Sequence, residues 1–124
     1  MEWNMVKSPD DIDYLLKTFN NFHDSCIVLI KYESGAYVNK SNSSMQPLNT
    51  KRILSVVFQS QFKSCYSVEI VFNKLVKLNL QPIDENYDCI INSATLKKVD
   101  NYFLWEDSSE TCLIECKEIM WRKI

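Results

Sequence analysis

The fold is decided by residues 19–30, which read FNNFHDSCIVLI. Up to Phe22, apolar side chains recur at helical spacing from Ile12 onward, and the run 26–30 that follows is apolar throughout. The first pattern predicts an amphipathic helix and the second a strand. His23 is the only histidine of the chain and falls between the two. The sequence therefore predicts that a helix passes into a strand at the position of the one imidazole.

The predicted helix has a recognisable start in residues 8–11, which read SPDD. Serine suits the N-cap, proline the first helical position, and the two aspartates face the positive end of the helix dipole. Asn20 and Asn21 can end the helix through a left-handed residue. We expect one helix, over about 9–21, and no other helix in the chain.

Beyond the helix, polar and apolar residues alternate with a period of two, which is typical of strands. Residues 24–33 are apolar on both faces, so we expect this strand at the centre of the sheet, covered on both sides. The polar segment 39–50 is the longest loop and the one that we expect to be mobile. A tight turn is predicted at Asp100 and Asn101. Further strands are expected over 52–60, 65–73, 76–81, 87–99, 102–106 and 111–122.

Consecutive strands joined by short turns predict an antiparallel meander. The single early helix is then available to cover one face of the sheet. The expected fold is therefore α+β, with one N-terminal helix packed on a curved, mainly antiparallel meander sheet, or partly open barrel, of about seven strands. Since the chain has 124 residues, we expect a single domain over 1–124.

Composition excludes several classes of function. Gly35 is the only glycine, whereas phosphate-binding loops, dinucleotide fingerprints and the G-x-S-x-G nucleophile elbow each need more than one. A net charge of −2 gives no attraction for polyphosphate, so we expect no nucleic-acid partner. No apolar run approaches the ~20 residues of a membrane span, so we expect no membrane partner either.

The five cysteines are odd in number and no secretory signal precedes them, so we expect reduced thiols in a cytoplasmic protein. Cys112 and Cys116 fall in a predicted strand, where their Cα atoms would lie about 13 Å apart. That separation exceeds the roughly 7 Å limit for a disulfide, and we interpret both as core residues. With one histidine and no ligand spacing, the sequence predicts no metal site and no cofactor.

His23, Asp24 and Ser25 are residue types used in acid–base and nucleophilic catalysis. Neighbours on a strand point to opposite faces, so these three cannot act together if they are extended, although they could turn toward one another at a helix-to-strand junction. The alternative is structural: Asp24 would bind backbone N–H groups, while His23 would cap the helix or pack against the sheet. We favour the structural role, with His23 packed beneath the helix, and predict no catalytic residue and no enzyme.

Trp105 and Trp121 belong to an aromatic group near the C-terminus, beside charged residues such as Glu106. Exposed aromatic side chains flanked by charge are typical of protein-binding hot spots. The alternative, which we favour, is cross-strand packing in the core. Acidic residues also concentrate in predicted turns at 84–88 and 106–110, and they would attract a basic partner if the turns converge. The candidate binding residues are His23, Asp24, Ser25, Trp105, Glu106 and Trp121.

The order of these features resembles that of short, mostly uncharacterised bacterial proteins, some of them regarded as immunity proteins of contact-dependent or polymorphic toxin systems. The resemblance is carried by a helix followed by Phe22-His23-Asp24-Ser25-Cys26-Ile27, and by a closing strand that ends in Met120-Trp121-Arg122. It implies a cytoplasmic inhibitor that blocks a cognate toxin by surface complementarity, without chemistry of its own.

Two hypotheses follow for the function. The leading one is a non-enzymatic cytoplasmic protein-interaction domain, with an immunity protein that neutralises a toxin encoded nearby as its specific case. The alternative is a small-ligand-binding domain, weakly hydrolytic or not, with a pocket near His23 in the mouth of the curved sheet. We expect a monomer, or a weak homodimer formed by pairing of an exposed edge strand.

Overall fold

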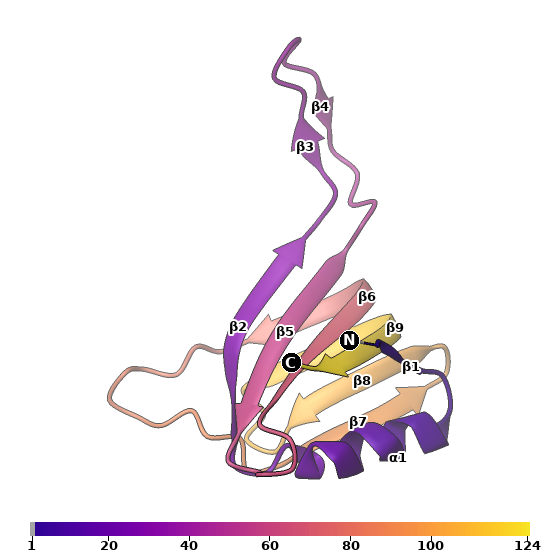
Figure 1. The fold of residues 1–124 in the computed structure, drawn as a ribbon. Helices are drawn as coiled ribbons and strands as arrows, with labels where there is room; N and C mark the ends of the chain where they lie inside the picture. Colours follow the sequence, from indigo (N-terminus) through magenta and orange to yellow (C-terminus); the bar gives the residue numbers. More distant parts are fainter. Residues whose placement is uncertain (1) are drawn as a thin grey trace.

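One helix and a mainly antiparallel sheet make up the fold in the computed structural model, which describes residues 2–124 (Figure 1). The helix is α1, Pro9–Thr18, and a 3-10 turn, Asn20–Phe22, follows it. The predicted α+β class is confirmed. The strands are β1 (Asn4–Val6), β2 (Ser25–Glu33), β3 (Tyr37–Val38), β4 (Met45–Gln46), β5 (Ile53–Ser60), β6 (Ser67–Leu80), β7 (Ala94–Val99), β8 (Tyr102–Asp107) and β9 (Cys112–Lys123).

The main sheet has seven strands, six of them in the order β2-β5-β6-β9-β8-β7, with β1 paired to β9. The expected meander is present in each half, as β2-β5-β6 and β7-β8-β9, and the two halves join because β9 rather than β7 lies beside β6. The curved sheet does not close into a barrel. Ser25 and Ile91 form one antiparallel bridge, with N···O distances of 3.3 and 2.7 Å, that ties β2 to the chain before β7.

The start of α1 follows the sequence signal. The Ser8 hydroxyl accepts a hydrogen bond from the Asp11 N–H at 3.3 Å, and the Asp11 carboxylate accepts from the N–H groups of Ser8 and Lys7. These backbone donors, Lys7 first, lower the pKa of Asp11 below its usual value. The helix ends at Thr18 rather than near 21, because the chain turns left-handed at Asn20, Asn21 and Phe22 with φ between 52° and 62°.

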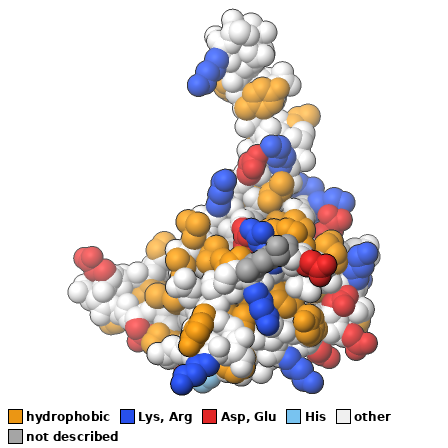
Figure 2. Space-filling view, in the orientation of Figure 1, with side chains coloured by type: hydrophobic (Ala, Val, Ile, Leu, Met, Phe, Trp, Pro, Cys, Tyr) orange, Lys and Arg blue, Asp and Glu red, His pale blue; other side chains and the backbone are white. Residues whose placement is uncertain are grey.

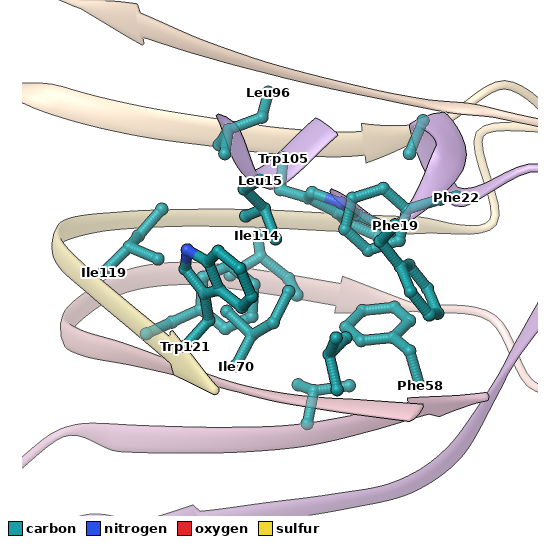
Figure 3. Close-up of a cluster of buried hydrophobic side chains, with 14 of the residues drawn as sticks. Leu15, Phe19, Phe22, Phe58, Ile70, Leu96, Trp105, Ile114, Ile119 and Trp121 are labelled. Carbon is teal, nitrogen blue, oxygen red and sulfur yellow. The ribbon is translucent and has the colours of Figure 1, made fainter. Parts of the chain in front are cut away.

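The core lies between α1 and the concave face of the sheet (Figure 3). Phe22, Phe58 and Trp105 are fully buried, and their ring centroids lie 5.0 to 5.5 Å apart. This cluster joins the 3-10 turn to β5 and β8. Because each buried aromatic side chain contributes about 2 kcal/mol through burial alone, these rings fix where the chain leaves the helix.

The prediction that residues 24–33 form a central strand, covered on both faces, is wrong. This segment is β2, an outer strand of the sheet that pairs with β5 on one side. Val28 and Leu29 are 53 % and 57 % exposed. A run of apolar residues shows that both faces of a strand carry apolar side chains, but not whether the second face packs against another layer. In the described residues, no other layer covers the second face of β2.

Other boundaries differ where the chain bends. The predicted strand 76–81 is the far end of β6, which continues past a bulge between Leu75 and Lys77. The predicted hairpin turn at Asp100 and Asn101 is confirmed, but β7 begins at Ala94 instead of residue 87. Strand β1, which the sequence did not predict, extends the sheet beside β8 along the same edge of β9.

Residues 34–52, which we call the arm, extend the β2-β5 hairpin away from the body of the protein (Figure 1). The two pairs of β3 and β4 lie within it: β4 falls in the segment 39–50 that was predicted as a polar loop, and β3 directly precedes that segment. The single glycine stands at its base: Gly35 has φ of 93°, and a Cβ there would lie 2.5 Å from the Thr50 hydroxyl and 2.7 Å from the Lys51 nitrogen. Only glycine fits this close approach.

Candidate binding surface

His23 lies on the surface, so the expectation that it packs beneath the helix is wrong. Its side chain is 58 % exposed, and the Nδ1 atom lies 2.8 Å from the carbonyl oxygen of Asn92. Its Nε2 atom lies 3.3 Å from the Asp24 carboxylate. Both ring nitrogens therefore face acceptors that belong to the protein.

His23 and Asp24 meet because the chain is not extended where they stand. Asp24 has φ of 52°, which follows the left-handed residues of the 3-10 turn and brings the two side chains to the same side. They border a shallow hollow of about 320 Å³, together with Asn20, Gln61 and Lys63. With its Nδ1 hydrogen donated to Asn92, the ring binds Asp24 as an ion pair when Nε2 also carries a proton.

Ser25 does not join this pair. It is buried, and its hydroxyl donates a hydrogen bond of 2.6 Å to the carbonyl oxygen of Phe22. A serine nucleophile needs a base within hydrogen-bond reach of its oxygen, and here that oxygen is bound to the backbone. The three neighbours therefore hold the helix-to-strand junction together and do not form a catalytic triad.

The structure separates the aromatic candidates from His23. Trp105 and Trp121 are buried in the core, where Trp121 packs on Tyr14 with ring centroids 5.6 Å apart. Neither side chain is available to a partner of the folded protein, so the alternative of core packing describes them. Glu106 is half-buried on β8, opposite Leu113 of β9. These three residues thus form no common surface with His23 and Asp24.

A second hollow opens in the mouth of the curved sheet, and we call it the mouth hollow. Its volume is about 810 Å³, and its apolar walls include Ile27 and Ile30 of β2, Leu80 of β6, and Ile91. Asp84, Asp88 and Asp107 also line it, so part of the acidic turns does converge in space. His23 is not among its lining residues, contrary to the expected position of a ligand pocket.

The carboxylates of the mouth hollow differ in their availability. Asp107 is buried and accepts hydrogen bonds from the N–H groups of Thr111 and Cys112 at 2.8 and 3.0 Å. Asp84 and Asp88 are exposed, and each uses one carboxylate oxygen in its own turn. The second oxygen of each is left for a partner. Desolvation, with a smaller effect of Asp107, raises the pKa of the Cys112 thiol to about 12, so this thiol stays protonated.

Sequence reasoning missed an exposed apolar surface that lies on the arm. Tyr37, Val38, Met45 and Leu48 are each more than half exposed. Figure 2 shows hydrophobic side chains on the projecting arm and around its base. We call these four residues the arm surface. Met45 and Leu48 fall within 39–50, whose serine and asparagine content predicted a loop, and Tyr37 and Val38 directly precede it.

The two outer strands of the sheet are protected to different degrees. α1 runs alongside β7, which also carries Lys97 and Lys98 (Figure 1). The helix hinders pairing of β7 with another chain, and this cover distinguishes the two strands, since β2 also carries charged residues, Lys31 and Glu33. Within the described chain, residues 2–124, no strand pairs with the outer side of β2 beyond the bridge at Ser25. β2 is thus the open edge of the sheet.

Comparison of the chain with protein-family models, with curated proteins and with solved structures finds no match. In the part of the chain that the structure describes, no helix is long and apolar enough to cross a membrane. Among residues 2–124, no three side chains of the kinds that ligate metals come together.

Proposed function

We propose that this chain is a non-enzymatic protein-binding domain that holds its partner on the arm and the adjoining strand β2. The single observation that carries the proposal is the arm surface, which stands away from the body and leaves its large apolar side chains in solvent. As a specific case, we propose that the partner is a toxin encoded nearby, which the domain neutralises as an immunity protein.

The energetics of the arm support a partner. A ladder of two residue pairs, such as β3 with β4, is marginal in water without further packing. Large side chains such as Tyr37 and Met45 release free energy when they are covered, about 25 cal/mol for each Å² of apolar area. Between Ala36 and Thr50 the only charged residue is Lys40, so a partner that covers the apolar side chains has to desolvate at most one charge of this segment.

The chemistry of His23 supports a structural role over a catalytic one. A general base needs a free nitrogen within hydrogen-bond reach of the substrate proton. Here Asn92 and Asp24 occupy both ring nitrogens. The ring acts as a link between the helix-to-strand junction and the segment before β7.

The proposal is tested by complex formation with the purified product of the neighbouring gene. The native domain is expected to form a stoichiometric complex on size-exclusion chromatography. A variant in which a short Asn-Gly turn replaces residues 37–48 is expected to fold and to lose at least about tenfold in affinity, since several apolar anchors are removed. Val99→Lys, which alters an exposed apolar residue at the other end of the sheet, is the control. Unchanged affinity without the arm would overturn the proposal.

A second candidate function rests on the mouth hollow. Its volume of about 810 Å³ lies in the range of small-molecule sites, which run from roughly 300 to 1,000 Å³. A ligand there would contact Ile27 and Ile30 rather than His23. Ile30→Lys would then abolish a thermal shift produced by that ligand, whereas His23→Ala would leave the shift unchanged.

A further inference from the structure

The open edge of β2 presents a regular stretch of backbone. A bulge at Val28, where the pairing with β5 shifts, separates this stretch from the bridge between Ser25 and Ile91. From Leu29 to Glu33 the pairing with β5 is continuous. The N–H and C=O groups on the other side of such a strand can pair with the backbone of one more strand. The partner segment must therefore be extended rather than helical.

The side chains of an added strand would reach the mouth hollow. Ile30 lies opposite Val56 in the pairing register, and Val56 is fully buried on the concave face. Ile30 therefore faces the same side, where it lines the mouth hollow. In a new strand, the residue beside Ile30 and those two positions away from it would point to that side as well. Alternate side chains of the segment would thus lie over the hollow, where long basic side chains can lay their aliphatic stems on the apolar wall and extend their charged ends beyond it.

Charge defines the remaining chemistry of the segment. Asp84 and Asp88 line the mouth hollow and are exposed, and neither a lysine nor an arginine is among the lining residues. A cationic side chain at the hollow would gain charge-assisted hydrogen bonds from the carboxylate oxygens left free by the turns. An acidic side chain would be repelled.

We propose that the open edge of β2 pairs with an extended segment of a protein partner in which lysine or arginine alternates with aliphatic residues. The segment forms backbone hydrogen bonds along Leu29–Glu33. Its basic side chains point to the side of Ile30, toward Asp84 and Asp88, and its aliphatic side chains point to the opposite side, beside the exposed Leu29. This inference rests on the proposed protein-binding function and names the chemistry of the partner.

The first test uses a capped synthetic peptide of alternating lysine and valine, with binding followed by fluorescence anisotropy and by backbone amide NMR. Amide shifts are expected at Leu29–Glu33 and not at Ala94–Val99. A peptide of alternating glutamate and valine is expected to bind at least about tenfold more weakly, because its charge is reversed. Methylating every second backbone nitrogen of the peptide removes the N–H donors of one of its two edges. This change is expected to abolish binding when it is made on the edge that pairs with β2, and not when it is made on the other edge. Equal loss for both edges, or shifts confined to β7, would overturn the inference.

The second test changes the protein. The double variant Asp84→Asn with Asp88→Asn keeps the oxygens that accept from Asn86 and Ile90, so the turns are preserved. It is expected to weaken binding of the lysine peptide by about tenfold and to flatten the salt dependence. Glu85→Gln is the matched control, since Glu85 lies in the same loop but does not line the hollow. An equal effect of the control and the double variant would contradict the charge assignment.

The arm-truncated variant separates this inference from the proposed function. It is expected to retain the affinity of the native domain for the lysine peptide, because the peptide pairs with β2 and not with the arm. If the peptide fails to bind while the arm-dependent complex with the neighbour's product forms, the inference is wrong and the proposed function stands. If the peptide binds along β2 while truncation leaves the protein complex intact, the inference stands and the role of the arm is wrong.

Discussion

The Nδ1 atom of His23 lies 2.8 Å from the carbonyl oxygen of Asn92, a residue 69 positions further along the chain. The contact stands next to the bridge between Ser25 and Ile91. Together they hold the segment before β7 against the first residues of β2. Because residues 81–84 and 87–92 line one wall of the mouth hollow, this link sets the shape of the hollow.

His23→Ala removes the hydrogen bond to Asn92 and the contact with Asp24 at a half-exposed position. We expect the free energy of unfolding to fall by at most about 1 kcal/mol. We also expect faster hydrogen exchange of the Ile91 amide, which donates to Ser25. Urea unfolding and NMR exchange measure the two effects. Lys63→Ala, in the same shallow hollow, is the control. If His23→Ala lowered the free energy of unfolding by several kcal/mol, His23 would contribute more to stability than these contacts explain.

The ion pair between Glu69 and Arg122 makes stability depend on pH. Partial burial by itself raises the pKa of Glu69, but the Ser55 hydroxyl at 2.8 Å and the Arg122 guanidinium at 2.8 Å together lower it below the ordinary value of 4.5. A carboxyl whose pKa is lower in the folded state stabilises the protein fully above its unfolded pKa. That stabilisation is lost as the pH falls through the folded pKa.

Arg122→Gln is therefore expected to lower stability at neutral pH and to flatten the loss of stability below about pH 4.5. Urea unfolding over a series of pH values measures this. Glu118→Gln breaks an exposed pair with Lys74 at 3.5 Å and provides the comparison. An identical pH profile in the native protein and in Arg122→Gln would refute the role of the pair.

Gly35→Ala tests how the base of the arm is built. The added Cβ would meet a backbone nitrogen, that of Lys51, as well as the Thr50 side chain, and alanine is strained at φ of 93°. We expect a loss of about 1–3 kcal/mol. The amides of Lys51 and Arg52, which both donate to the Ser34 carbonyl, should exchange faster. Thr50→Gly in the same chain should recover little, and full recovery would contradict the backbone clash.

Trp105→Ala separates a core role from a binding role. Trp105 is fully buried between Phe22 and Phe58, so its truncation is expected to cost about 3–5 kcal/mol of stability. Trp3→Ala removes a half-exposed ring that stacks 4.4 Å from the Arg122 guanidinium, and about 1 kcal/mol or less is expected there. Thermal unfolding compares them. If Trp105→Ala kept wild-type stability but bound the partner more weakly, Trp105 would belong to the binding surface and not to the core.

Local features of the chain were predictable because their causes are local. Ser8 and Asp11 contact each other within one helical turn, and Asp100 with Asn101 forms a turn between adjacent strands. Cys112 and Cys116 were predicted as core residues of a strand, and both are buried in β9. Each of these depends on residues a few positions apart, where spacing and side-chain type decide the backbone.

The candidate site was predictable only in part. His23 and Asp24 were singled out by residue type. Their orientation, however, depends on the left-handed backbone of Phe22 and Asp24, and no pattern of side chains predicts that conformation at these residues. The arm surface was missed because Met45 stands among serines and asparagines, and Tyr37 precedes that polar stretch. They became a surface only when β3 paired with β4.

The sequence by itself determined an α+β chain with one capped helix, alternating strands and an acidic, glycine-poor composition, since propensity, periodicity and charge act over a few residues. Tertiary structure alone decided that β2 is an open edge, that β9 lies beside β6, and that Ile30 comes to the same hollow as Asp84. These relationships join positions far apart in the chain. They follow from which strands pair and how the sheet curves, and such long-range pairing leaves no mark on local periodicity.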